Sequence, residues 1–320
     1  MAKPVVVLTR KWTANVERAM AERFDLRTHP RDEAAPSEDI LARCQGAEVL
    51  CPAAGPVSGD FVRALPASIR LIANFGAGID HMDLEAARAR GFMVSNTPEV
   101  VTEEVADLAF GLIIAACRRF HESNELVRTD GWPHGVMNFN LGQRVWGQCL
   151  GIVGMGRIGT AIARRARGFQ MPILYHNSHR DTAAEAAYEA RYCPTLEALL
   201  TQADIVVLAT PGGAETHHII NAATLALMKS SAVLVNVGRG PAVDEAALAE
   251  ALANNRIAAA GLDVHEFEPE VSAAMRKLPN VFLLTHMGTG TAAARDAMGI
   301  RVMRNIEAYV ADGEPVDRVA

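Results

Sequence analysis

Residues 150–159, which read LGIVGMGRIG, constrain the fold of this chain more than any other segment. A short apolar run ends in Gly-x-Gly-x-x-Gly, and the Ala- and Arg-rich residues 160–169 that follow have a helical pattern. A second apolar run, residues 171–175, comes at the distance expected of a βαβ unit. An isolated motif of this kind is equally compatible with a glycine-rich loop that binds nothing, but strands on both sides favour a dinucleotide-binding turn.

The three glycines of this turn have separate physical roles. They allow a tight turn, close approach of the backbone to a pyrophosphate, and close packing of the helix on the strand. The start of the helix adds unpaired N–H groups and a partial positive charge, both of which favour phosphate binding. The expected cofactor contacts of the turn are Gly154, Met155, Gly156, Arg157, Ile158 and Gly159.

Length and composition indicate two globular domains. A chain of 320 residues is too long for one ordinary core, and 50% hydrophobic and 21% charged residues are typical of a folded, water-exposed protein. The net charge of -6 gives no indication of nucleic-acid or anionic-membrane binding. The apolar runs at residues 5–8 and 108–117 are too short for a signal peptide or a membrane span. We therefore expect a cytoplasmic protein.

Cysteines and histidines give no sign of disulfides or a metal site. The five cysteines have no C-x-x-C spacing, which favours reduced thiols. The pairs His176 and His179, and His217 and His218, lack further ligands at metal-site spacing. We expect surface or loop histidines and no bound metal.

Apolar and helical segments alternate along the whole chain, which predicts an α/β fold with parallel sheets. In the first hundred residues, this alternation indicates a small flavodoxin-like domain. Its expected strands are residues 4–9, 26–28, 47–52, 71–74 and 93–95, and its expected helices are 13–23, 40–44, 59–65 and 84–90.

A long helix is expected over residues 101–125, almost without a break, and buried up to Cys117. Turn-forming residues fill 128–145 and predict a loop or arm. Beyond the glycine turn, the βα alternation continues to a final helix. Expected strands are 205–209, 232–237, 258–264 and 281–284, and expected helices are 222–228, 245–254 and 291–312.

Three segments that follow predicted strands carry residues that could take part in catalysis. Arg239 follows the strand 232–237, Glu268 follows 258–264, and His286 follows 281–284. An arginine can hold a carboxylate with two hydrogen bonds, and an imidazole beside a carboxylate is favoured in its protonated form. Each residue alone is more often structural. Together, at the strand ends where ligands of α/β proteins bind, they suit hydride transfer to a 2-keto acid.

The chain resembles the D-isomer specific 2-hydroxyacid dehydrogenase family over nearly its whole length. The matching segments occur in the family's order and are 76–83 (GAGIDHMD), 96–98 (NTP), 106–109 (ADLA), the glycine turn, 236–240 (NVGRG), 261–269 (GLDVHEFEP) and 286–288 (HMG). The resemblance implies that Arg239 binds substrate, that Glu268 pairs with the histidine, and that His286 is the general acid/base.

The resemblance also implies a domain arrangement and further contacts. Residues 1–99 plus 288–320 form the substrate domain, into which a Rossmann nucleotide-binding domain of residues 100–287 is inserted, with 100–145 forming a homodimer interface. A helix buried between domains is the alternative for this last segment.

The substrate carboxylate is expected on the amides of Ala77 and Gly78, near Ala53 and Ala54. Further implied cofactor contacts are Thr102, Thr210, Pro211, Thr216, Val237, Gly238, Asp263, His286 and Gly288; Asp263 could instead only cap a loop.

The end of the second strand of the βαβ unit indicates which dinucleotide is bound. NAD-binding turns usually carry Asp or Glu there, but this chain has Asn177, which does not repel a 2′-phosphate. Ser178 and Arg180 can contact that phosphate. The pattern is similar to NADPH-using glyoxylate and hydroxypyruvate reductases, although their usual Arg after the Asn is Ser178 here. We expect NADP(H) to be preferred and NAD(H) to be possible.

The leading hypothesis is reduction of a small 2-keto acid, glyoxylate or hydroxypyruvate, to a D-2-hydroxy acid by a homodimer that binds neither nucleic acid nor membrane. The small side chains of residues 51–56, together with Met287 and the 288–291 segment, leave bulky or aromatic 2-keto acids open, as in a D-mandelate dehydrogenase-like enzyme. Thr285 stands where the family usually has proline. A nucleotide-sensing protein similar to C-terminal-binding-protein corepressors is a third possibility.

Overall fold

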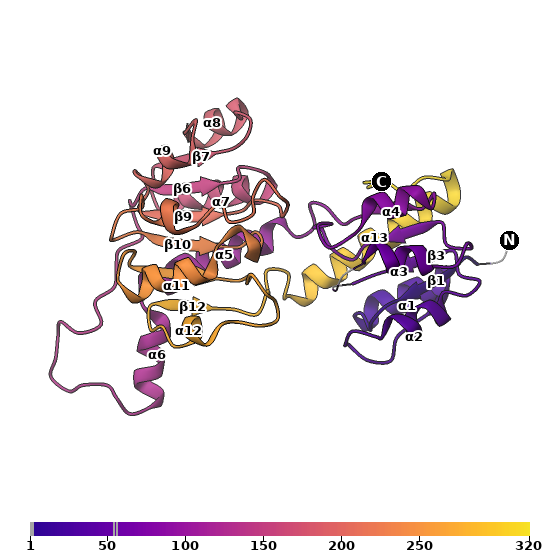
Figure 1. Cartoon of the computed structure of the whole chain (residues 1–320), viewed down its shortest axis with the longest axis horizontal. Coiled ribbons are helices and arrows are strands. Elements are labelled where there is room, and N and C mark those ends of the chain that lie inside the picture. Colours follow the sequence, from indigo (N-terminus) through magenta and orange to yellow (C-terminus); the bar gives the residue numbers. More distant parts are fainter. Residues whose placement is uncertain (1–2, 54, 56) are drawn as a thin grey trace. The chain divides into compact units, whose positions relative to one another are not determined.

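The computed structural model describes residues 3–53, 55 and 57–320, and the chain divides into two compact units. Unit 1 comprises Met1–Val101 and Thr289–Ala320, and unit 2 comprises Thr102–Gly288. Each unit has one parallel sheet with helices, which confirms the α/β fold class (Figure 1). The roles predicted for the two units remain predictions.

Unit 1 has a five-stranded sheet in the order β2-β1-β3-β4-β5, the strand order of flavodoxin-like folds. Its strands are β1 (Val5–Leu8), β2 (Asp25–Arg27), β3 (Val49–Cys51), β4 (Leu71–Ala73) and β5 (Met93–Ser95). Its helices are α1 (Ala14–Arg23), α2 (Ser37–Arg43), α3 (Gly59–Ala64), α4 (Leu84–Ala89) and α13 (Ala292–Asp312). The last helix therefore belongs to the first unit.

A glycine lets α13 pack closely against α1. A Cβ atom at Gly299 would lie 2.5 Å from Cγ1 of Val16, so any larger residue would push the two helices apart. Val16, Val302 and Ile306 are buried in unit 1. The contact explains how a segment nearly three hundred residues away in the chain completes the unit.

Unit 2 has a seven-stranded parallel sheet in the order β12-β11-β10-β9-β6-β7-β8. Its strands are β6 (Leu150–Val153), β7 (Ile173–His176), β8 (Arg191–Tyr192), β9 (Ile205–Leu208), β10 (Val233–Asn236), β11 (Ala259–Leu262) and β12 (Val281–Leu283). Its helices are α5 (Thr102–Cys117), α6 (Phe120–Arg128), α7 (Arg157–Gly168), α8 (Thr182–Tyr188), α9 (Leu196–Leu200), α10 (Ala222–Leu225), α11 (Glu245–Ala253) and α12 (Ala273–Arg276), with a 3-10 turn at Gly240–Ala242. The direction of winding reverses between β6 and β9.

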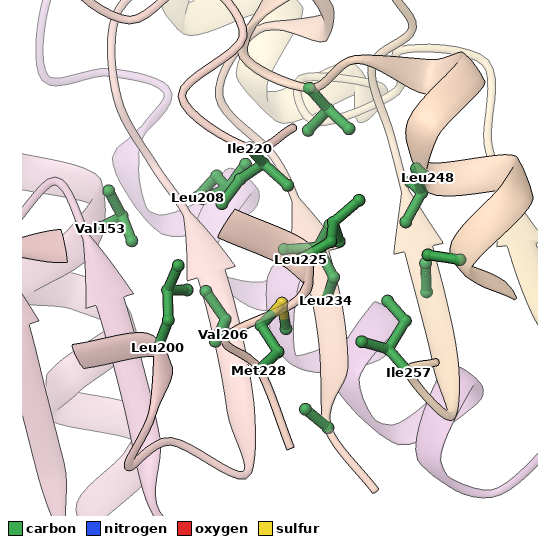
Figure 2. Close-up of a cluster of buried hydrophobic side chains, with 14 of the residues drawn as sticks. Val153, Leu200, Val206, Leu208, Ile220, Leu225, Met228, Leu234, Leu248 and Ile257 are labelled. Atoms are coloured by element: carbon green, nitrogen blue, oxygen red, sulfur yellow. The ribbon is translucent and has the colours of Figure 1, made fainter. Parts of the chain in front are cut away.

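Helices on both faces bury the central strands of unit 2. Strands β6, β9, β10 and β11 are buried at every position, as their continuous apolar sequences suggest. Figure 2 shows Val206, Leu208 and Leu234 on the strands, with Leu225 and Leu248 packed against them. This core fixes the strand ends that carry the candidate site.

The helix expected over 101–125 is wrong in one respect, because the structure has two helices there. Helix α5 ends at Cys117 and α6 begins at Phe120, with Arg119 between them in the left-handed region at φ 54°. The carbonyl of Cys117 accepts a hydrogen bond at 2.6 Å from the N–H of Gln143, so it is unavailable to continue a helix. The break thus depends on a segment far along the chain. Helix α5 is buried as expected.

Residues 129–149 form the expected irregular segment, which follows α6 and extends away from the sheet of unit 2 (Figure 1). The short elements α8, β8, α9 and α12 were not predicted, because each is too brief to have a distinct period. The five cysteines are free. Within the described part of the chain, no helix combines the length and apolarity required to cross a membrane.

Candidate functional site

The glycine turn of unit 2 has the geometry that its sequence predicts. Gly154 follows β6 with φ +97°, a backbone conformation that strongly favours glycine. A Cβ atom at Gly159 would lie 2.1 Å from the carbonyl oxygen of Gly154, so only glycine lets the helix pack this closely on the turn. A Cβ atom at Gly156 would meet nothing within 4 Å, so that side of the turn is open.

The N-terminus of α7 presents backbone N–H groups to this open side. Gly156 is the N-cap residue and offers no side chain to the N–H groups of the first helical turn. Of the turn's amides, that of Met155 is already used, because it donates to Oδ1 of Asn177 at 2.6 Å. The residues fit a dinucleotide: the N–H groups and the positive end of the helix suit a pyrophosphate, and the glycines leave it room.

Strand ends meet closely where the sheet changes direction. A Cβ atom at Gly154 would lie 2.8 Å from the carbonyl oxygen of Ala209, and one at Gly238 would lie 2.7 Å from that of Thr210. Oγ1 of Thr210 is buried and has no hydrogen-bond partner among the described residues. An unpaired buried hydroxyl at a topological switch point is what a bound ligand would satisfy.

The polar residues after β7 are engaged within unit 2. Arg180 donates from Nε and Nη2 to the two carboxylate oxygens of Glu185, both at 2.7 Å. Oε1 of Glu185 also accepts a hydrogen bond from the Tyr175 hydroxyl at 2.7 Å. Hydrogen bonds from Arg180 and then Tyr175 lower the pKa of Glu185 to about 2, so this carboxylate is ionised at neutral pH. Ser178 contacts His179 and is exposed.

The structure brings Glu268 and His286 into contact at the carboxyl edge of the sheet. Oε2 of Glu268 lies 2.8 Å from Nδ1 of His286, which leaves Nε2 of the exposed imidazole available to a substrate. Arg239 follows β10, the strand next to β11, and its Nη1 donates to the carbonyl of Gly238. The three residues thus follow three successive strands of one sheet, as predicted. Their catalytic roles remain predictions.

Asp263 holds the loop that carries His286. Its two carboxylate oxygens accept hydrogen bonds from the N–H groups of Met287 and Gly288, at 2.7 and 2.9 Å. Its carbonyl accepts another from His286, whose φ of +53° is unusual for a residue with a side chain. Asp263 therefore caps this loop, which was one of the two roles considered for it.

Burial and hydrogen bonding oppose each other at these two carboxylates. Burial raises the pKa of Asp263 above its usual value, although the N–H donors of Met287 and Gly288 oppose the shift. For Glu268, burial also favours the neutral form, but hydrogen bonds from His286 and from the N–H of His265 outweigh it and lower the pKa. Glu268 is thus kept as an anion beside the imidazole.

Unit 1 contains the predicted amide turn, and two asparagines, of which Asn74 is buried and Asn96 half-buried, shape it. Nδ2 of Asn74 donates to the carbonyls of Gly76 and Gly78, at 3.0 and 2.9 Å, and Asn96 donates to the carbonyl of Ala77 at 2.7 Å. With the carbonyls held this way, no described residue accepts a hydrogen bond from the N–H of Ala77 or Gly78. The turn therefore has two unpaired donors at the end of β4, suitable for a carboxylate.

The remaining predicted contacts occupy loops at strand ends. Ala53 is buried and donates its N–H to Oγ1 of Thr9, whereas Ala54 lies outside the described residues. Thr216 donates to the carbonyls of Pro211 and Gly213 and so stabilises the loop after β9. Thr102 begins α5, and Val237 is buried beyond β10. Their cofactor contacts remain predictions.

Sequence reasoning did not single out Asn74, Glu185, Glu245 or His265 as parts of the site. Asn74 is the last residue of the strand predicted over 71–74, and a polar residue at that position was an available signal. His265 lies within the GLDVHEFEP segment, but nothing local distinguished it from a loop residue. Glu245 lies on a helix, and only the fold brings it to a strand end, whereas Glu185 is close to Arg180 in the sequence.

Comparisons with known proteins agree with this geometry. Residues 110–288 match the family model described as D-isomer specific 2-hydroxyacid dehydrogenase, NAD binding domain. The chain is 39% identical over 312 residues to a glyoxylate reductase of Thermococcus gammatolerans, covering 96% of this chain and 93% of that protein. It is 38% identical over 307 residues to glyoxylate/hydroxypyruvate reductase A of Arabidopsis thaliana, covering 95% of each.

A solved structure extends the similarity to the whole fold. It is that of an NADPH-dependent glyoxylate/hydroxypyruvate reductase of Sinorhizobium meliloti, determined with NADP and malonate. The TM-score is 0.89 at 35% sequence identity, and the match covers 100% of this chain and 97% of that chain. Both units of the present chain therefore have counterparts in a reductase that binds NADP.

Proposed function

The chain belongs to the D-isomer specific 2-hydroxyacid dehydrogenase family and is an oxidoreductase with a nicotinamide cofactor, and on this premise we propose that it reduces glyoxylate or hydroxypyruvate to the D-2-hydroxy acid. The observation that carries the proposal is the hydrogen-bonded pair of Glu268 and His286, on the same sheet edge as Arg239. Relatives named for these two substrates match nearly the full length of the chain.

The residues of unit 2 divide the chemistry among themselves. The bound nicotinamide supplies the hydride. Protonated His286 donates its Nε2 proton to the carbonyl oxygen of the keto acid, and ionised Glu268 stabilises the imidazolium through Nδ1. The guanidinium of Arg239 holds the substrate carboxylate and draws electron density from the adjacent carbonyl. In unit 1, the unpaired N–H groups of Ala77 and Gly78 are suited to binding a carboxylate.

We infer that NADPH is preferred over NADH, while NADH is still used. Asn177 takes the position where an acidic residue would repel a 2′-phosphate, and its Oδ1 is already bonded to Met155. Arg180 supplies a cation held in place by Glu185, and its Nη1 is not part of that fork. An NADPH-dependent reductase at 35% identity supports this inference.

We further propose that the protein is a cytoplasmic homodimer and that α6 and residues 129–149 form its interface. This segment exposes large apolar side chains to water, including Trp132 at 64% and Met137 at 91% exposure. A subunit interface would remove this apolar surface from water. Analytical ultracentrifugation of the purified chain tests this point directly. A monomer at micromolar concentration would contradict it.

Initial rates with the purified protein test the function. Glyoxylate, hydroxypyruvate, pyruvate and phenylglyoxylate are compared, each with NADPH and with NADH. We expect fast NADPH oxidation with the first two acids. A preference for phenylglyoxylate would overturn the substrate assignment in favour of bulky 2-keto acids, and binding of NADPH without turnover of any acid would favour a nucleotide-sensing protein.

A further inference from the structure

His265 is a buried histidine that touches all three segments carrying the candidate catalytic residues. Its backbone N–H donates to Oε1 of Glu268 at 3.0 Å. Its ring Nε2 lies 2.8 Å from the carbonyl of Leu284, two residues before His286. Its own carbonyl lies against Gly240, next to Arg239, where an added Cβ atom would be only 1.7 Å away.

The hydrogen bond to Leu284 determines where one ring proton lies. A carbonyl oxygen only accepts hydrogen bonds, so Nε2 of His265 must carry a proton. The other ring nitrogen, Nδ1, lies 3.4 Å from Oε1 of Glu245. Nδ1 makes no hydrogen bond to a described residue. An unprotonated Nδ1 would place its lone pair near a carboxylate oxygen, which is repulsive in a buried site. The contact is attractive only if Nδ1 carries a second proton and the ring is positively charged.

Glu245 is itself a buried carboxylate, with a side chain that is 6% exposed. Its Oε1 accepts a hydrogen bond from the N–H of Glu266 at 3.0 Å, and Oε2 of Glu266 accepts one from the N–H of Glu245 at 3.1 Å. The outer end of this cluster is His218, whose Nε2 lies 2.6 Å from Oε1 of Glu266. Among the described residues, His265 is the one ion-pair partner of Glu245. A buried carboxylate of this kind requires a compensating positive charge.

We propose that His265 is a positioning residue: its backbone N–H holds the carboxylate of Glu268, and Glu245 keeps its buried ring doubly protonated, so that this imidazolium keeps Glu268 ionised beside His286. The nearby carboxylate of Glu245 raises the pKa of His265 despite its burial. Glu268 in turn receives the N–H of His265 and the favourable influence of its positive charge, both of which lower its pKa. The proposal rests on the proposed function and adds to it a residue that controls the acid/base pair without touching substrate.

Four segments carry the charged groups around the ring of His265. Glu245 faces the ring from α11, and His286 lies on the loop after β12. Arg239 follows β10, and the segment of His265 itself carries Asp263, Glu266 and Glu268. Glu245 is the direct counter-ion of the His265 imidazolium. Beyond this pair, the positive charge of His265 acts on the carboxylate of Glu268 and, through it, on the imidazole of His286.

The charge of His265 is measured first, by NMR of the full-length protein labelled with 15N-histidine. Long-range 1H–15N correlations distinguish a doubly protonated ring from a neutral one, and the signals missing from His265→Phe assign those of His265. We expect both ring nitrogens to remain protonated from about pH 6 to about pH 8, well above the range of an ordinary histidine. A neutral His265 with Nδ1 unprotonated in that interval would overturn the proposal, whether or not any keto acid is turned over.

The influence of His265 on catalysis is measured by the pH dependence of kcat/KM for keto acid reduction. Phenylalanine retains the volume of the ring but removes its charge and its hydrogen bond. Without the nearby cation, protonated His286 is more stable, so we expect the alkaline midpoint of the His265→Phe profile to move upward by about half a unit or more. We also expect kcat/KM to fall about 10-fold or more, with the KM for NADPH within about twofold of wild type. A lower kcat/KM with an unchanged midpoint would show a merely structural role and overturn the proposal.

Two further variants keep the test decisive. Glu245→Gln leaves the ring in place and removes the group that holds its second proton; we expect Nδ1 to lose its proton near neutral pH and the alkaline midpoint to move in the same direction. His29→Phe is the matched control, since His29 is also buried and its ring also bonds a backbone carbonyl, that of Arg31. An equal midpoint shift in His29→Phe would overturn the proposal. If wild type turned over no 2-keto acid, the proposed function would fail, and the NMR result would still decide the charge.

Discussion

The carboxyl edges of the two sheets present different chemistry. In unit 1, the turn after β4 offers backbone N–H groups, and neutral asparagines donate hydrogen bonds to its carbonyls. In unit 2, the loops after β10, β11 and β12 carry Arg239, Glu268 and His286, with a second buried layer of ionisable residues. Fixed amide dipoles bind an anion at any pH, whereas an imidazole beside a carboxylate can exchange a proton. Under the proposed function, we expect unit 1 to contribute to binding and unit 2 to contribute proton transfer.

The largest expected effect comes from removing the imidazole. In His286→Ala, no group remains to donate the proton, so we expect kcat to fall about 10³-fold or more, whereas the affinity for NADPH changes far less because His286 is only one of its expected contacts. Stopped-flow or steady-state reduction rates, together with NADPH titration by fluorescence, measure the two quantities. Turnover equal to wild type would place the acid/base elsewhere and remove the distinction between the units.

Replacing Glu268 separates the charge of the pair from its imidazole. The pKa of Glu268 is lowered from an ordinary 4.5. The stabilising interaction of the ionised carboxylate with His286 is therefore present at neutral pH and is lost as the pH falls below that value. We expect Glu268→Gln to reduce kcat about 10²-fold and to remove the acidic limb due to this carboxylate from both the rate and the stability profiles. Chemical denaturation between pH 3 and pH 7 (roughly the interval in which Glu titrates) gives the stability profile.

Glu270→Gln is the matched control for this prediction, because Glu270 is an exposed carboxylate on the same loop. We expect its profiles to coincide with those of wild type. If both variants lost the acidic limb, or neither did, the limb would not originate from the Glu268–His286 pair.

In unit 1, we expect a smaller effect that acts on binding and not on proton transfer. Asn74→Ala removes two donors from the carbonyls of Gly76 and Gly78, so the amide turn loses its fixed shape. The KM for the keto acid should rise about 10-fold, consistent with the loss of one or two hydrogen bonds, with no change in the pH midpoints or in the KM for NADPH.

Asn15→Ala is the corresponding control, since Asn15 is exposed in the same unit and bonds only Asp296. It should leave all constants unchanged. A shifted pH midpoint in Asn74→Ala would contradict the division of tasks between the two units.

The smallest expected effect concerns cofactor preference. In Arg180→Ala, the cation near the proposed 2′-phosphate is lost, so we expect the KM for NADPH to rise about 5-fold while that for NADH changes by less than about twofold. Arg191→Ala removes one exposed arginine from the same unit and should affect neither cofactor. Equal changes for both cofactors in Arg180→Ala would show that Arg180 makes no phosphate contact.

Much of the fold could be predicted because its determinants are local. The apolar strands of both sheets, the glycine turn at 154–159 and the positions of Arg239, Glu268 and His286 after strands all follow from patterns within a few residues. The resemblance to a family then related these segments to one another. The prediction of one helix over 101–125 was wrong because the determinant of its break is not local. The break at Arg119 depends on a hydrogen bond from Gln143.

The sequence by itself determined the strands, their end residues and the backbone geometry that only glycine adopts, because steric limits and periodicity act over short distances. Only the tertiary structure decided that Glu245 lies against His265 and that the carboxylate of Asp263 holds the loop of His286. Each of these contacts joins segments far apart in the sequence, which meet only when the strands and helices have packed. Whether a buried side chain is charged depends on its neighbours, and those neighbours exist only in the folded chain.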